Sequence, residues 1–205
     1  KALTAEIGDR VNESFVLHNH NNLYMQVGDY DTARKMILEL LDLTRQLDDQ
    51  EGYCLALLSL SHYQAATGEI EASLQSAREL HTLSVEGGYR SELACALHME
   101  ASLLLTLGRT AEAVDGYRQA HALRVELDES AEAIESLAGL AQARLRAGDR
   151  AGAAEAIEAV LEYLAASGVE GFEEPGALFL ACFQLLQAMH DPRALAVLRQ
   201  GHDLL

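Results

Sequence analysis

The sequence predicts an all-α fold built from stacked pairs of antiparallel helices. Turn glycines recur at intervals of forty residues, at Gly28, Gly68, Gly108 and Gly148. Between them, apolar residues fall three and four positions apart, which is the spacing of one face of an α-helix. No alternating strand pattern occurs. A fixed period of roughly twenty to fifty residues is typical of repeat proteins, in which each helix pair buries its remaining apolar face against the next pair.

Small and apolar side chains keep fixed places relative to these glycines. Short residues precede each glycine by seven positions and follow it by five: Asn21, Ser61, Ala101 and Ala141, then Ala33, Ser73, Ala113 and Ala153. Residues nine and twelve positions after the glycines are Ile37, Ala77, Tyr117 and Ile157, then Leu40, Leu80, Ala120 and Val160. Short side chains let two helix axes approach to about 8–10 Å, and the larger ones fill the space between pairs.

We expect helices over residues 14–27 and 30–47, 52–67 and 70–86, 91–107 and 110–127, 131–147 and 150–167, and 175–189 and 192–205. The repeats would span about 11–50, 51–90, 91–130, 131–170 and 171–205, in one array over residues 1–205. Each turn glycine suits a left-handed helix end. Breaks between pairs are expected at Asp48-Asp49, Gly87-Gly88 and Asp128-Glu129. Residues 168–176 favour a flexible loop, and Pro175 and Pro192 suit the first turns of helices.

Charge and cysteine content limit the classes of partner. The chain carries 32 acidic and 15 basic residues, for a net charge of −17. This argues against direct binding of nucleic acid or anionic membranes, which needs clustered Lys and Arg. No run of eighteen apolar residues occurs, so no membrane span is expected. The three cysteines, Cys54, Cys95 and Cys182, do not form a disulfide framework, and we expect reduced thiols in a cytoplasmic protein.

Both ends of the sequence continue the repeat pattern. Residues 1–10 align with residues 41–50 at the same offset of forty, and residues 201–205 remain amphipathic without a stop signal. We therefore expect the chain to be a fragment of a longer array.

The second half of each repeat resembles the tetratricopeptide repeat, which places Ala, an aromatic residue and Ala after its turn glycine. Gly108, Ala113, Tyr117 and Ala120 reproduce that pattern, and Gly148, Ala153 and Ile157 come close. The chain departs from the family in its period, which is forty instead of about thirty-four, and in having no Trp. The resemblance implies a right-handed superhelical solenoid of antiparallel helix pairs, with a concave face formed mainly by the first helix of each pair.

Residues 178–198 contain a His-Asp-Pro-Arg turn between two helices. This segment resembles the end of helical arrays in large bacterial signalling proteins, namely ATPase-based transcriptional activators and nucleotide cyclases. The resemblance implies a non-enzymatic interaction or sensor module in a signalling or transcription-regulating protein.

Counting back from the turn glycines predicts which residues line the concave face. Its mixture of polar and apolar side chains suits a peptide, a partner helix or a neighbouring domain. A solvated wall without a ligand is the alternative. The predicted partner-binding residues are Phe15, His18, Asn22, Gln26, His62, Cys95, His98, Ser102, Glu135, Gln142 and Arg146.

Other functions are weaker alternatives. Asn22 lies where some tetratricopeptide domains bind a C-terminal carboxylate, but the accompanying Lys is replaced by His18, which weakens the case for a chaperone-like adaptor. We expect His18, His62 and His98 to lie about 10 Å apart on different helices, too far for one metal ion. His81 and His121 are expected to be packing residues, and the adjacent acids Glu173-Glu174 to favour a helix start.

Two further alternatives concern self-association and catalysis. Leu178, Phe179, Phe183 and the last helix could pack against a second copy, giving a homodimer. No nucleotide-binding, hydrolase or metalloprotease motif occurs, so neither an enzyme nor a cofactor is expected.

Tyr117 tests the packing pattern. Truncation to alanine should lower the free energy of unfolding by about 3–5 kcal/mol, as at other buried aromatic residues. Thermal or urea unfolding of Tyr117→Ala measures this, and an unchanged stability would contradict the pattern.

Overall fold

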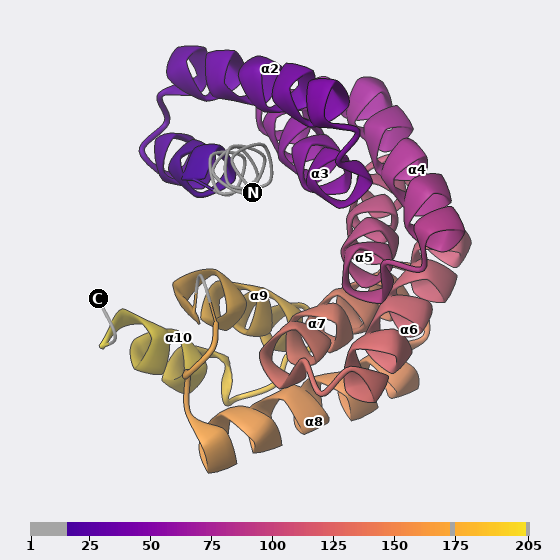
Figure 1. The fold of residues 1–205 in the computed structure, drawn as a ribbon. Coiled ribbons are helices and arrows are strands. Elements are labelled where there is room, and N and C mark those ends of the chain that lie inside the picture. The colour runs from indigo at the N-terminus through magenta and orange to yellow at the C-terminus, as the bar shows by residue number, and fades with distance from the viewer. Residues whose placement is uncertain (1–15, 173–174, 204–205) are drawn as a thin grey trace. The chain divides into compact units, whose positions relative to one another are not determined.

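The computed structural model describes residues 16–172 and 175–203, and these ranges contain helices and turns without strands (Figure 1). The all-α helical-repeat fold predicted from the sequence is therefore confirmed. The chain divides into two compact units, residues 1–103 and 104–205, with the boundary inside one helix. That both units belong to one uninterrupted array stays a prediction.

The helices follow one another at a nearly constant length. In the first unit, residues 16–26 are helical and are followed by α2 (Tyr30–Leu47), α3 (Gln50–Ala66), α4 (Ile70–Gly87) and α5 (Arg90–Thr106), which crosses the boundary. The second unit contains α6 (Thr110–Glu126), α7 (Ser130–Arg146), α8 (Arg150–Ser167), α9 (Pro175–Ala188) and α10 (Ala194–His202). Residues 16–26, α3, α5, α7 and α9 are the first helices of the pairs, and α2, α4, α6, α8 and α10 are the second helices.

Turns with positive φ recur twice in every repeat. The residues with φ between 54° and 87° include Gly28, Asp48, Gly68, Gly88, Gly108, Asp128, Gly148 and Gly168, each twenty positions after the one before. Asp48 and Asp128 take the left-handed conformation that glycine takes elsewhere, which a short polar side chain tolerates. The repeat of forty is thus two turns of twenty, and both sets of breaks predicted from the sequence are confirmed.

An aspartate often follows the left-handed residue and caps the next helix. The backbone N–H groups of Thr32, Gly52 and Gly152 donate to the carboxylates of Asp29, Asp49 and Asp149 at 3.1, 3.0 and 2.9 Å. Such a cap satisfies one of the free N–H groups at a helix start and places a negative charge at the positive end of the helix dipole.

The core of the first unit lies where a second helix packs on the next first helix. Ile37 and Leu40 of α2, Leu57 of α3 and Leu80 of α4 share one buried cluster with Ala96 of α5. Small residues occupy the crossing within a pair, as predicted.

In the pair of α3 and α4 the small residues at this crossing are serines. Ser61 and Ser73 are buried, and each hydroxyl lies within hydrogen-bond distance of the other residue's carbonyl oxygen, at 3.1 and 2.7 Å. Polar side chains at this crossing are therefore satisfied without water.

The core of the second unit contains a residue that the sequence pattern did not single out. Phe172 lies in the loop between α8 and α9, but its side chain is buried and meets the Tyr163 ring edge-on, with centroids 6.1 Å apart. The predicted loop is therefore anchored in the core at this point. Glu173 and Glu174, predicted to favour a helix start, lie outside the described residues.

Two predictions about the C-terminal segment need correction. Pro175 begins α9 as expected, but Pro192 lies in the turn before α10, which starts two residues later. Leu178 and Phe179, suggested as a dimer surface, are buried in the core of their own unit. Their apolar area is already removed from water, so a second copy gains nothing from them.

Tyr117 and Gly139 show how closely two helices approach in the second unit. Tyr117 of α6 is buried, and its ring lies against the Gly139 backbone of α7 so closely that a Cβ at residue 139 would overlap it. The absence of a side chain at Gly139 makes room for the aromatic residue that follows the turn glycine.

We expect Gly139→Ala to lower the free energy of unfolding by about 1–3 kcal/mol, because the added methyl group displaces the Tyr117 ring. Gly176 is the matched control: it lies in α9 with no neighbour near its Cβ position, and Gly176→Ala should be neutral or stabilise by about 0.5–1 kcal/mol. Urea unfolding of both variants measures the difference, and equal effects would contradict the contact.

Candidate functional site

The predicted partner-binding residues lie on the first helices of the pairs. In the first unit they belong to residues 16–26, α3 and α5, which lie on one side of the unit, with α2 and α4 on the other (Figure 1). Phe15 lies outside the described residues. The predicted residues of the first unit and those of the second are described in turn.

A hydrogen-bonded network centred on His18 joins the first helix to α3. His18 Nδ1 lies 2.9 Å from Ser59 Oγ, and the Asn22 amide nitrogen lies 3.5 Å from His18 Nε2. The Ser59 hydroxyl also lies 3.1 Å from the Leu55 carbonyl oxygen, to which it donates. Ser59 therefore accepts from His18 Nδ1–H, which leaves Nε2 to accept from Asn22. This assigns His18 as a neutral imidazole with its proton on Nδ1.

His62 lies on α3 close enough to His18 to influence its ionisation. Loss of hydration, and next the repulsion from His18, lower the pKa of the His62 imidazole from 6.5 to about 4. Its side chain is nevertheless exposed, and contact with water makes a smaller depression physically reasonable. With either value the imidazole is neutral at pH 7.

The remaining predicted residues of the first unit differ in exposure. Cys95, His98 and Ser102 lie on α5 and are half-buried, and each interacts with another group. Gln26 is exposed at the end of the first helix. The structure thus links His18, Asn22 and His62 through neighbouring helices, while Gln26 stands apart.

In the second unit the predicted residues lie on α7. Glu135 and Gln142 are half-buried, and Glu135 interacts with another group. Arg146 is exposed, and its Nη1 donates to the Leu105 carbonyl oxygen at 3.2 Å. This contact ties the end of α7 to a backbone carbonyl, so Arg146 has a structural task besides any role in binding.

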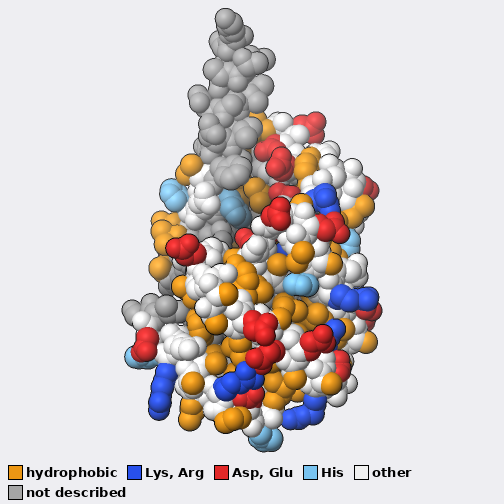
Figure 2. All heavy atoms as spheres, turned by 90° about the horizontal axis from the view of Figure 1, so that it is seen from below, with side chains coloured by type: hydrophobic (Ala, Val, Ile, Leu, Met, Phe, Trp, Pro, Cys, Tyr) orange, Lys and Arg blue, Asp and Glu red, His pale blue; other side chains and the backbone are white. Residues whose placement is uncertain are grey.

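The predicted binding residues of the first unit are polar without carrying a full charge. We call His18, Asn22, His62, Cys95, His98 and Ser102 the neutral strip. Elsewhere the surface is charged, and on the face in Figure 2 acidic and basic side chains surround hydrophobic ones. A strip without acidic residues stands out in a chain of net charge −17, because it is where an approaching chain meets the least short-range repulsion.

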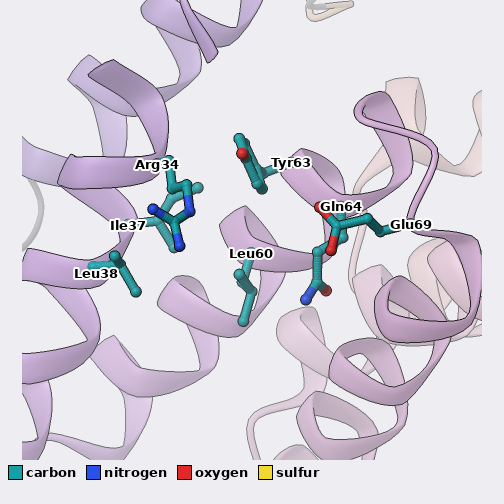
Figure 3. A pocket seen from close by; sticks show the side chains of 7 residues that line it. All are labelled: Arg34, Ile37, Leu38, Leu60, Tyr63, Gln64 and Glu69. Atoms are coloured by element: carbon teal, nitrogen blue, oxygen red, sulfur yellow. The ribbon is translucent and has the colours of Figure 1, made fainter. Parts of the chain in front are cut away.

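A shallow pocket of about 220 Å³ lies elsewhere in the first unit, between α2 and α3. Figure 3 shows Ile37, Leu38 and Leu60 around an apolar base, with Arg34 and Glu69 at opposite sides. None of these residues was predicted as a site from the sequence.

His81 and His121 bind protein groups, as expected for packing residues. His81 Nδ1 lies 2.6 Å from Glu100 Oε1, and His121 Nδ1 lies 2.9 Å from the Ala133 carbonyl oxygen. Both histidines are half-buried and join a second helix to the next first helix.

Among the described residues, no group of three or more His, Cys, Asp or Glu side chains is arranged to hold a metal ion. No helix in the described ranges is both long enough and apolar enough to cross a bilayer.

Sequence reasoning missed Ser59, which orients His18. The available signal was a serine inside an apolar helix: such a hydroxyl bonds to the carbonyl four residues earlier, but the sequence could not show that a histidine 41 positions away shares it.

His62 gives a pH-dependent prediction. Because its folded pKa lies below the value of 6.5 for the free side chain, its contribution to stability is complete above pH 6.5 and is lost as the pH falls towards 4. We expect wild-type protein to lose more stability than His62→Gln between about pH 7 and about pH 5. Urea unfolding at several pH values measures this, with the interval from pH 7 to pH 8 as the control; parallel curves throughout would contradict it.

Comparison with known proteins supports the fold. No family model matches the sequence, and no curated protein matches it. Among solved structures, BtubC (BKLC) from P. vanneervenii superposes with a TM-score of 0.73 at 17% identity, covering 97% of this chain and 88% of that chain.

A second similar structure is that of a putative kinesin light chain with nearly identical TPR-like repeats from Podosopora anserina. It has a TM-score of 0.67 at 17% identity and covers 92% of both chains. The architecture expected from the resemblance of Gly108, Ala113, Tyr117 and Ala120 to the tetratricopeptide pattern is thereby confirmed: the chain has the all-α, helical-repeat fold of tetratricopeptide-like proteins.

Proposed function

We propose that this chain is a non-enzymatic protein-interaction scaffold. Its binding surface would be the neutral strip of the first unit, extended by Glu135, Gln142 and Arg146 of the second. The ligand would be a peptide, a helix or a neighbouring domain. The observation that carries the proposal is the neutral strip itself, which presents hydrogen-bonding groups from successive first helices.

The hydrogen bonds of the strip suit recognition of a polypeptide. Ser59 and Asn22 hold His18 in one tautomer and orientation, and a side chain held in this way loses little conformational entropy when it binds. His62 is exposed and neutral at pH 7, so one ring nitrogen can donate to a backbone carbonyl and the other can accept from an N–H.

The charge of the strip favours this function over an adaptor for C-terminal tails. A terminal carboxylate is best bound by Lys or Arg, and the strip contains neither. The tail-binding adaptor therefore remains the weaker proposal.

The cellular setting is a proposal from the C-terminal sequence. The resemblance of residues 178–198 to helical arrays of bacterial signalling proteins supports a cytoplasmic role in signalling or transcription regulation. In such a protein, a ligand on the strip would alter helix packing and so influence the domains attached to the array.

The test is selection of peptides on the wild-type chain, followed by binding measurements on a His62→Glu, His98→Glu double variant. The two carboxylates should reduce affinity at least about tenfold for peptides that occupy the strip. Far-ultraviolet circular dichroism and a thermal melt check that half-buried His98 tolerates the change.

The matched control carries the same two charges away from the strip. Gln119 and Gln187 are exposed on α6 and α9, and Gln119→Glu, Gln187→Glu should leave the affinity unchanged. Selected peptides that bind the strip variant and the control equally well would show that the strip is not the binding surface.

A further inference from the structure

The first helix exposes a face that is covered in the later repeats. Val16 and Leu23 are 51% and 56% exposed. One repeat later, the residue matching Val16 is Ala56, and two repeats later it is Ala96; both are 0% exposed. The residue matching Leu23 in the third repeat, Leu103, is 3% exposed. The same helical face is therefore buried in later repeats and open in the first.

In the later repeats a preceding second helix covers this face. Tyr63 of α3 meets the Tyr30 ring of α2 with centroids 6.5 Å apart, and Glu100 of α5 bonds to His81 of α4. In the second unit, Gly139 of α7 lies against Tyr117 of α6. Three contacts of one kind thus define what the exposed face of the first helix fits: the outer side of a second helix.

The last second helix, α10, exposes the complementary side. Ala194 is its buried small residue, in the place held by Ala33 and Ala153 in earlier second helices. Four positions later, Ile37 and Ile157 are 1% exposed, whereas Leu198 of α10 is only half-buried. The next residue after Ala194, Leu195, is 62% exposed.

We propose that the chain associates head to tail with a second copy, α10 of one copy packing on residues 16–26 of the next. Val16 and Leu23 form the N-terminal edge of this contact, and Leu195 and Leu198 form its C-terminal edge. Both halves of the stacking contact repeated inside the chain are then supplied by one sequence. Because the two edges differ, the contact is heterologous and continues into a ring or a chain of copies.

Charge opposes this association at low ionic strength. Each copy carries a net charge of −17, and salt screens the repulsion between copies while leaving burial of apolar side chains intact. Association should therefore strengthen as sodium chloride is raised.

The experiment is sedimentation velocity at protein concentrations up to about 1 mM, which reveals even weak contacts. Wild-type protein should form species larger than a monomer as its concentration rises. Leu23→Glu and Leu195→Glu should each be monomeric under the same conditions.

Mixing the two variants tests the head-to-tail geometry. Leu23→Glu retains its C-terminal edge and Leu195→Glu retains its N-terminal edge, so an equimolar mixture should form a dimer and nothing larger. A contact between two copies of α10 would instead leave Leu23→Glu able to associate and would overturn the proposal.

Matched controls place the same charge on apolar residues away from both edges. Val85 of α4 and Val125 of α6 are exposed to a similar extent, and Val85→Glu and Val125→Glu should associate like wild type. A wild-type chain that stays monomeric at every concentration and salt level overturns the proposal, as does a variant mixture without dimers.

Discussion

Burial of each first helix beneath the second helix before it is the contact on which the rest of the structure depends. A single helix pair leaves part of its apolar surface in water, and only the neighbouring pair can cover it. In the first unit Ile37 and Leu57 meet in this contact, and in the second unit Tyr117 rests on the backbone of Gly139. Stability is therefore distributed along the chain as a series of similar contacts between neighbours.

The turns keep that contact in register. A left-handed residue every twenty positions fixes the length of each helix, so the same face returns to the same neighbour in every pair. Glycine meets this backbone requirement at most positions, and Asp48 and Asp128 meet it at the others. Asp29, Asp49 and Asp149 then begin the next helix by accepting from its free N–H groups. Helix length and helix packing are thus set by different residues.

This division of tasks leaves the outer side of the first helices free to vary. Because neither the turns nor the stacking contacts need those positions, the neutral strip can carry histidine, asparagine and serine without cost to the core. His18 shows how such a residue becomes ordered: its partners Ser59 and Asn22 come from a neighbouring helix and from its own. Polar groups that are already hydrogen-bonded form a surface of fixed shape, which suits recognition of a polypeptide.

Periodicity alone determined the fold class, the helix order and the turn positions. Spacing from Gly28 to Gly148 reports a backbone constraint, and small residues such as Ala113 report a close helix crossing; both are local consequences of side-chain size. The tertiary structure decided the rest. Ser59 beside His18, Phe172 in the core and Leu178 inside its own unit each depend on which distant side chain fills the adjacent space. Such contacts join residues far apart in the chain, and they are fixed by packing, which a repeating pattern of residue types does not specify.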